Sequence, residues 1–195
     1  MTTILLATLL HLFVQAEPVQ ATETRPPQAD AEMKMMTFNI RLGTAKDGPN
    51  HWKHRRGMVF DVLRKHRPDL VGMQEVIRFQ LDEILEAVPE YGAFGAGRED
   101  GKSAGEYSPI LYRKGRFRVL EEGTFWLSET PEVPGSKSWD TACTRVCTWG
   151  RFADSASGRT FYLYNTHLDH VSQPARENGV ALILERMCSN KHAAT

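Results

Sequence analysis

Residues 162–170 read YLYNTHLDH and join an apolar run to a dense group of polar side chains. The first three residues favour a buried strand, because aromatic and aliphatic side chains fit a pleated, half-buried surface. The next six hold Asn165, Thr166, two histidines and an aspartate around a single leucine. This change of character predicts a strand that delivers hydrogen-bonding groups to a site at its end.

The composition is that of one soluble globular domain. The chain has 195 residues, 41% of them hydrophobic and 25% charged, which supplies a core and excludes a disordered chain. The net charge is zero, but residues 33–195 carry 23 basic and 20 acidic residues. This mild excess suits a phosphate-bearing substrate and is far from the charge of a nucleic-acid-binding surface.

The first 16 residues have the pattern of an export signal. Residues 4–14 are apolar apart from Thr8 and His11, and residues 14–16 offer a small-residue cleavage site. The run is too short to span a bilayer, and a short buried helix is the alternative. Residues 17–32 are polar and contain proline, so we expect a disordered linker there. The sequence thus predicts a secreted or periplasmic protein with its domain in residues 33–195.

The three cysteines do not indicate a disulfide framework. Cys143 and Cys147 lie in a segment that we expect to be one strand, which separates their Cα atoms by roughly 13 Å. The Cα atoms of two disulfide-bonded cysteines lie at most about 7 Å apart, so Cys143 and Cys147 are not expected to form a disulfide. Cys188 alone has no expected partner.

Hydrophobic periodicity gives the order of the elements. Strands are expected at residues 33–41 and 69–75, each followed by a helix, at residues 52–66 and 77–88. The pattern then changes to strands separated by turn residues, at residues 109–113, 117–120, 123–127, 144–152 and 160–166. A last helix is expected at residues 176–187. This order indicates a layered α/β fold with a mixed or mostly antiparallel sheet.

Three polar residues stand at the ends of expected strands. Asn39 lies near the end of the first, Glu75 ends the second, and His167 follows residues 160–166. Loops at the carboxyl ends of strands in open α/β sheets converge on one crevice, where ligands bind. A carboxylate, an amide and an imidazole there suit a divalent cation and a phosphate, since Mg²⁺ takes one or two protein carboxylates and fills its shell with water and substrate oxygens.

Each candidate also has a purely structural interpretation. Asn39 can close a turn, and Glu75 can begin the next helix with its carboxylate in solvent. His167 can be a hydrogen-bonded structural histidine, and Arg145, on an expected strand, can point to solvent. Only the combination favours a site.

Four segments carry a family resemblance: MTFNIR (36–41), GMQEV (72–76), TRVCTW (144–149) and NTHLDH (165–170). In this order they resemble the motifs of the endonuclease/exonuclease/phosphatase superfamily of metal-dependent phosphodiesterases and phosphomonoesterases. The segments DGPNHWKHRR and ILYRKGRF are also similar to secreted or periplasmic bacterial members. Each motif alone is weak, but four in order are specific.

The resemblance implies a fold and a chemistry. The fold is a four-layered α/β sandwich of two mixed β-sheets flanked by helices, and the activity is hydrolysis of phosphoester bonds with Mg²⁺ or Mn²⁺. Carried over residue by residue, Glu75 is the principal metal ligand and Asn39 lies beside the metal and orients the phosphate. His167 donates to a phosphate oxygen and stabilises charge in the transition state.

Two further residues are carried over as weaker candidates. Arg145 is a phosphate or structural contact, and Asp169 is a candidate contact of the substrate phosphate. His170 extends the same cluster without an assigned role.

The chain also departs from the family pattern. The later Gly-Asp-x-Asn and Ser-Asp-His motifs are not found, and residues 188–195 lose the apolar period of the last helix. We therefore expect a C-terminally truncated domain, with residues 33–195 as its N-terminal portion. Without these motifs hydrolysis would lose its general base, and proton-transfer catalysis is typically worth about 10² to 10⁴ in rate. The alternative to a hydrolase is therefore a catalytically incomplete fragment or pseudoenzyme that keeps a phosphate and metal half-site.

The substrate cannot be chosen from the sequence. DNA, RNA, a phospholipid, an inositol phosphate and a nucleotide-like molecule all fit the superfamily, and neither a basic stripe nor an aromatic array singles out nucleic acid. A phosphoester is the only partner that we infer, and we expect a monomer.

Overall fold

The structure, a computed structural model, describes residues 31–191. The expected signal segment at residues 1–16, residues 17–30 of the expected linker and residues 192–195 lie outside the described residues.

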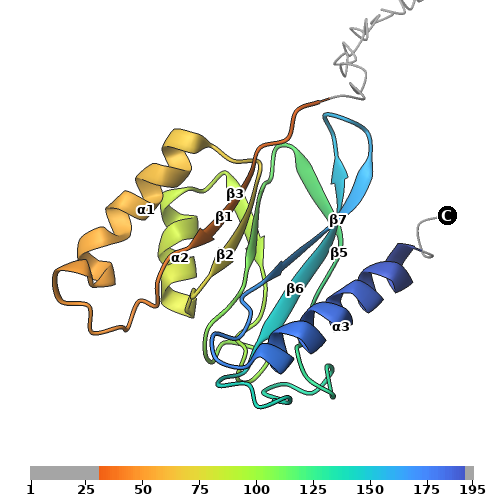
Figure 1. The fold of residues 1–195 in the computed structure, drawn as a ribbon. Helices are drawn as coiled ribbons and strands as arrows, with labels where there is room; N and C mark the ends of the chain where they lie inside the picture. The colour runs from red at the N-terminus through yellow and green to blue at the C-terminus, as the bar shows by residue number, and fades with distance from the viewer. Residues whose placement is uncertain (1–30, 192–195) are drawn as a thin grey trace, which may run out of the picture.

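The described chain forms four layers, which follow one another from left to right in Figure 1. Helices α1 (Trp52–His66) and α2 (Arg78–Ala87) cover a four-stranded sheet. This sheet packs against a three-stranded sheet, whose outer face is covered by helix α3 (Gln173–Lys191). The predicted four-layered α/β sandwich is confirmed.

The first sheet is mixed. Its strands lie in the order β1 (Met35–Asn39), β2 (Leu70–Gln74), β4 (Ile110–Arg113) and β3 (Tyr91–Phe94). Strands β1 and β2 are parallel, with Asn39 opposite Gln74, whereas the other pairs are antiparallel. Because β1 and β2 run in the same direction, the residues that follow both strands reach the same edge of the sheet.

The second sheet is antiparallel throughout, which refines the expectation of two mixed sheets. Its strands lie in the order β5 (Phe117–Trp126), β6 (Val146–Asp154) and β7 (Thr160–Thr166). Strand β5 replaces two expected strands, because a register shift between Val119 and Glu121 bends the ladder without ending it.

The sequence pattern does not predict strand β3. Its four residues, YGAF, include a glycine and are too few to show a period of two. Pairing with β4 makes the segment a strand. Cys143 lies in the loop before β6, not in the strand with Cys147, and the three cysteines are free.

Helix α1 has the predicted bounds. It ends at His66 and is capped by Arg67, which adopts a left-handed conformation (φ 45°) before Pro68. Helix α2 carries the buried Gln80, whose Oε1 accepts from the amide of Gly43 at 2.9 Å and whose Nε2 donates to the carbonyl of Arg41 at 3.1 Å. These bonds fix the loop that follows β1, which forms one side of the site described below.

The apolar interior has a layer on each side of the first sheet. Between the sheets lie mostly aromatic side chains: Leu70, Phe94, Ile110, Phe117 and Phe152. Between the helices and the first sheet lie mostly aliphatic ones, among them Leu63, Val71, Met73 and Ile84. The two sheets are therefore locked in one relative position, which is the condition for a site built from both.

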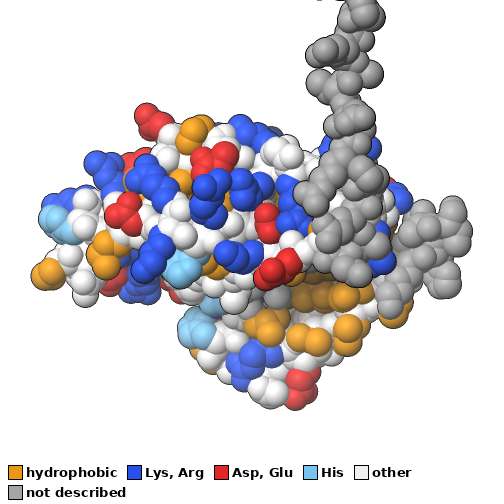
Figure 2. All heavy atoms as spheres, turned by 90° about the horizontal axis from the view of Figure 1, so that it is seen from above, with side chains coloured by type: hydrophobic (Ala, Val, Ile, Leu, Met, Phe, Trp, Pro, Cys, Tyr) orange, Lys and Arg blue, Asp and Glu red, His pale blue; other side chains and the backbone are white. Residues whose placement is uncertain are grey.

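Some apolar surface stays exposed. Figure 2 shows hydrophobic side chains gathered at one edge of a face that is otherwise dominated by charged groups of both signs. On α3, Val180 and Leu184 are more than one third exposed. No helix in residues 31–191 combines the length and hydropathy needed to cross a membrane.

Candidate active site

Asn39, Glu75 and His167 meet at one edge of the two sheets. Asn39 ends β1, Glu75 follows β2 and His167 follows β7. The Nδ2 atom of Asn39 donates to Oε1 of Glu75 at 2.8 Å, and Glu75 and His167 line the same pocket. The structure thus brings together the three residues that the sequence places at strand ends.

Glu75 is held as an ionised carboxylate. Its φ of 57° lies in the left-handed region, which residues other than glycine rarely adopt. Its Oε2 accepts from the amide of Leu42 at 3.2 Å. Burial acts to raise the pKa of Glu75, but the hydrogen bonds from Asn39 and Leu42, with the positive charge of Arg41, outweigh it and lower that pKa. The residue is therefore charged at neutral pH, as a ligand of a hard cation must be.

Asn39 both closes a turn and orients Glu75. Its Oδ1 accepts from the amide of Arg41 at 2.9 Å, while its Nδ2 holds the carboxylate of Glu75. The structural interpretation and the proposed site role of Asn39 are thus compatible. One lone pair of Oδ1 remains for a ligand.

His167 is a half-buried, uncharged imidazole. Burial lowers its pKa, and the charge of Arg145 lowers it further, against opposing effects of Glu75 and Glu106. Its Nδ1 is buried and has no hydrogen-bond partner within residues 31–191. Because buried polar atoms without partners are rare, this atom favours a ligand site over a purely structural role.

Arg145 is buried rather than facing solvent. Its side chain is 6% exposed, and its Nη2 lies 3.1 Å from Nδ1 of His170. Its Nε lies 3.6 Å from Oδ2 of Asp169 and has no hydrogen bond to any described residue. Because Arg145 also lines the pocket, its guanidinium suits an oxyanion there, since the planar fork of N–H groups matches phosphate geometry.

Asp169 lies behind Arg145 and does not line the pocket. Four donors reach its carboxylate at 2.7–3.1 Å: the amides of Ala142, Val171 and Ser172, and the hydroxyl of Thr141. Burial acts to raise the pKa of Asp169, but these hydrogen bonds hold it well below the ordinary range. A buried anion repels phosphate, so this position disfavours the expected phosphate contact and assigns Asp169 to holding Arg145.

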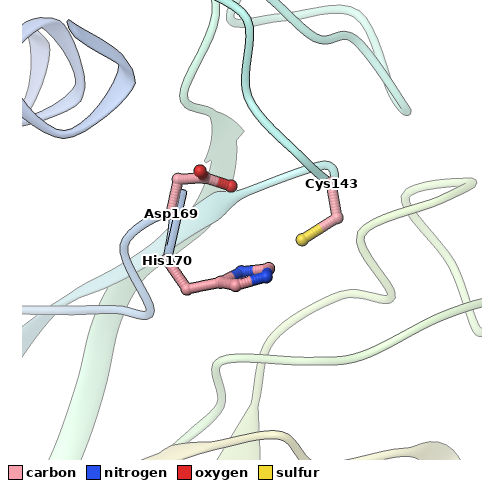
Figure 3. Close-up of side chains that lie close together, drawn as sticks. All are labelled: Cys143, Asp169 and His170. Atoms are coloured by element: carbon pink, nitrogen blue, oxygen red, sulfur yellow. The ribbon is translucent and has the colours of Figure 1, made fainter. Parts of the chain in front are cut away.

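Cys143, Asp169 and His170 form a small cluster at the side of the pocket. Their ligand atoms lie within 4.8 Å of one another, and Figure 3 shows the thiol of Cys143 and the ring of His170 pointing toward each other. Such a set can bind Zn²⁺. Here, however, Arg145 contacts His170, and both oxygens of Asp169 already accept hydrogen bonds. The permanent charge of Arg145 opposes a cation, so the cluster supports the guanidinium.

The pocket has a volume of about 360 Å³ and a mostly charged lining. It is lined by Arg41, Leu42, Glu75, Arg98, Glu106, Cys143, Arg145, His167 and His170. Arginines outnumber carboxylates there. The balance suits a small polar anion.

The sequence did not single out three charged residues of this lining. Arg41 follows β1, whereas Arg98 and Glu106 come from the loop between β3 and β4. The only local sign was the charge of GREDGKSAGEY at residues 97–107, and a charged loop is more often simply solvated.

Asn165 is a further residue that the sequence placed only within a cluster. It is buried in β7, and its Nδ2 donates to the carbonyls of Met73 and Pro109 at 2.8 and 2.9 Å. Its Oδ1 accepts from Nε2 of Gln74 at 2.8 Å. Asn165 thus joins the strand before His167 to the strand before Glu75. A Cβ at Gly72 would lie 2.6 Å from its Oδ1, so the sheets approach closely only because residue 72 is glycine.

Comparison with known proteins agrees with this geometry. Residues 36–184 match the model of the Endonuclease/Exonuclease/phosphatase family. The chain belongs to this family. A family protein of known structure from Bacteroides vulgatus is 43% identical, with a TM-score of 0.77, over 79% of this chain and 59% of that protein.

A second structure of the family carries a more specific description. It is a mannosyl-6-phosphatase from Bacteroides thetaiotaomicron, 36% identical with a TM-score of 0.80, over 84% of this chain and 62% of that one. Among curated proteins, an uncharacterised protein of Acanthamoeba polyphaga mimivirus is 23% identical over 80% of this chain and 62% of its own length. The chain therefore spans about three fifths of the length of these relatives.

Proposed function

We propose that this chain serves the divalent-metal-dependent hydrolysis of phosphoester bonds. The observation that carries the proposal is the convergence of Glu75, Arg145 and His167 on one pocket from both sheets, with Asn39 hydrogen-bonded to Glu75. An ionised carboxylate, a buried guanidinium and an imidazole are the groups that hold a hard cation and a phosphate side by side. Membership of the family supports the same chemistry.

The residues present fit Mg²⁺, with Mn²⁺ as the second candidate. Glu75 and Asn39 would hold the ion, because both offer hard oxygen atoms with unused lone pairs. The nearest competing cation is Arg41, whose Nη1 lies 3.8 Å from Oε2 of Glu75 but whose Nε binds Asp47 at 2.8 Å. When bound, the ion would offset charge on the phosphate and lower the pKa of a bound water.

In this proposal Asn39, Arg145 and His167 each have a different role. Asn39 keeps the carboxylate of Glu75 in place, and Arg145, which lines the pocket, binds a phosphate oxygen through its guanidinium. His167, neutral at pH 7, donates one N–H to a second phosphate oxygen and so stabilises charge that grows during the reaction.

A half-site without catalysis is the second candidate. The carboxylates that line the pocket are Glu75 and Glu106, and Glu106 is bound on both oxygens by Arg98. Within residues 31–191 the pocket therefore offers no free carboxylate as general base once Glu75 binds a metal. A half-site of this kind would bind Mg²⁺ and phosphate without turnover.

Phosphomonoesters are the first substrates to test, because the mannosyl-6-phosphatase is among the more similar structures. From the pattern of residues 1–16 we also propose that the protein is secreted or periplasmic. A monomer remains our proposal for its oligomeric state.

The experiment uses the 195-residue chain with p-nitrophenyl phosphate, with Mg²⁺ or with a chelator. We expect Mg²⁺-dependent turnover that Glu75→Gln reduces about 100-fold or more, because charge stabilisation by a metal is worth several kcal/mol. The matched control is Glu86→Gln, which changes an exposed glutamate on α2 and should leave the rate unchanged.

Two results separate the candidates. Turnover that survives both Glu75→Gln and the chelator would exclude a metal bound by Glu75. If turnover is absent, calorimetric binding of Mg²⁺ with inorganic phosphate that is lost in Glu75→Gln would favour the half-site.

A further inference from the structure

The loop between β3 and β4 places an arginine–glutamate pair on the wall of the pocket. The amide of Arg98 donates to the carbonyl of Glu106 at 3.1 Å. The Nη1 and Nη2 atoms of Arg98 donate to Oε2 and Oε1 of Glu106 at 3.1 and 3.0 Å. Both side chains are largely buried, at 14% and 17% exposed, so this bidentate pair is a fixed part of the wall.

The rest of the loop holds the pair in place. At the loop tip, Oδ1 of Asp100 accepts from the amides of Lys102 and Ala104 at 2.8 and 2.9 Å. The indole of Trp126 donates to the carbonyl of Arg98 at 2.6 Å, and the amide of Tyr107 donates to the carbonyl of Val76 at 2.6 Å. The loop is therefore tied to strand β5 and to the residue after Glu75.

The pair lies beside the groups assigned to the phosphate. Arg98 and Glu106 line the pocket together with Glu75, Arg145 and His167, and they also line a smaller crevice next to His167 and Arg145. Neither residue has a role in the proposed hydrolysis. They are placed where the part of a substrate next to the phosphate would lie.

The chemistry of the pair restricts what can bind there. A carboxylate has about four lone-pair sites, and Arg98 uses two of those on Glu106. The remaining sites accept hydrogen bonds from hydroxyl groups, whereas a second phosphate would meet the negative charge of Glu106. The wall thus favours a neutral group with hydroxyls over a charged or an apolar group.

We propose that Arg98 and Glu106 select the alcohol part of the phosphoester. The alcohol that they favour carries hydroxyl groups and no further charge, as in a phosphomonoester of a polyol or sugar. This inference rests on the proposed function, because it takes Glu75, Arg145 and His167 as the phosphate end of the site.

The experiment measures binding to the full chain with Mg²⁺ by calorimetry. The three probes are glucose 6-phosphate, cyclohexylmethyl phosphate, which has a similar size but no hydroxyl, and fructose 1,6-bisphosphate. We expect glucose 6-phosphate to bind about tenfold more tightly than either of the others, since hydrogen bonds to charged groups are the stronger ones.

Two variants and one control test whether Glu106 and Arg98 cause this preference for glucose 6-phosphate. Glu106→Gln keeps the size of the side chain but removes its charge, and should bring the three affinities within about threefold of one another. Arg98→Lys loses the bidentate geometry and should weaken the same preference. The control Glu99→Gln changes the more exposed glutamate of the loop, 3.4 Å from Arg98, and should keep the wild-type preference. Thermal unfolding of each variant checks that the fold is intact.

The outcomes distinguish the inference from the proposed function. Tight binding of cyclohexylmethyl phosphate with no preference for glucose 6-phosphate would overturn the inference and leave the phosphate site standing. An equal preference in wild type, Glu106→Gln and Arg98→Lys would also overturn it. Binding of none of the three probes would overturn both.

Discussion

The two packed sheets hold a largely buried arginine near aspartate at each of their two ends. The two arginines differ in how many of their N–H groups are hydrogen-bonded. At one end, Arg116 donates to both oxygens of Asp154 at 2.9 and 3.1 Å and to Asp69 at 2.9 Å. At the other, Arg145 contacts His170 and lies near Asp169, but its Nε has no hydrogen bond to a described residue. The first end is a structural joint between the two sheets, whereas the arginine of the second end is incompletely paired and lines the pocket.

The difference follows from what each arginine connects. Asp69 precedes β2 of the first sheet and Asp154 ends β6 of the second, so Arg116 joins the two sheets. Arg145 lies just before β6 and faces the pocket, supported from behind by Asp169. Arg116 thus serves the fold, whereas the position of Arg145 on the pocket wall lets its guanidinium bind an anion.

The largest expected effect is at the structural joint. Asp154→Ala leaves Arg116 without its bidentate partner, and removal of one partner of a buried pair costs about 3–5 kcal/mol. We expect this loss in the free energy of unfolding measured with urea. The matched control is Glu121→Ala, which removes the half-exposed partner of Arg151 and should cost less than about 1 kcal/mol. Equal losses in the two variants would mean that the joint is no stronger than a surface pair.

A smaller effect should appear in acid. Burial acts to raise the pKa of Asp154, but hydrogen bonds from Arg116, Ala156 and Ser157 lower it to about 2. A carboxyl group whose pKa is lowered in the folded state stabilises the fold at pH values above its ordinary pKa, near 4. This stability is lost as the pH falls toward 2. The contribution is on the order of 2 kcal/mol.

Unfolding measured from pH 6 to pH 2 checks this prediction. Asp154→Asn should lose less stability in acid than the wild type does. Arg145→Met should keep the wild-type acid slope, because local hydrogen bonds and not Arg145 hold the pKa of Asp169 down. A flattened slope in Arg145→Met would show that the pocket end is also a structural joint.

The smallest expected effect is on ligand affinity. Arg145→Met should weaken binding of inorganic phosphate with Mg²⁺ about tenfold, or roughly 1.4 kcal/mol, because it removes the buried oxyanion donor. Its free energy of unfolding should fall less than that of Asp154→Ala, because the four hydrogen bonds to the carboxylate of Asp169 remain when Arg145 is replaced. A large loss of stability together with unchanged phosphate affinity would reverse the roles assigned to the two ends.

Strand β7 shows which features the sequence predicts and which need the structure. Residues 162–170 alone predict a strand that ends in a polar cluster, with His167 at its end. They predict Asn165 only as a member of that cluster. Its contacts with Met73, Gln74 and Pro109 join residues more than 50 positions apart, which no local pattern encodes.

The sequence by itself determined the order of the elements other than β3, the bounds of α1 and the arrival of Asn39, Glu75 and His167 at strand ends. These follow from local periodicity and from the rule that strand ends converge at one edge of a sheet. The tertiary structure alone decided the existence of β3, the burial of Arg145 and the place of Arg98 and Glu106 in the pocket wall. Each of these depends on long-range pairing and packing, which set the direction of a side chain only after the two sheets have come together.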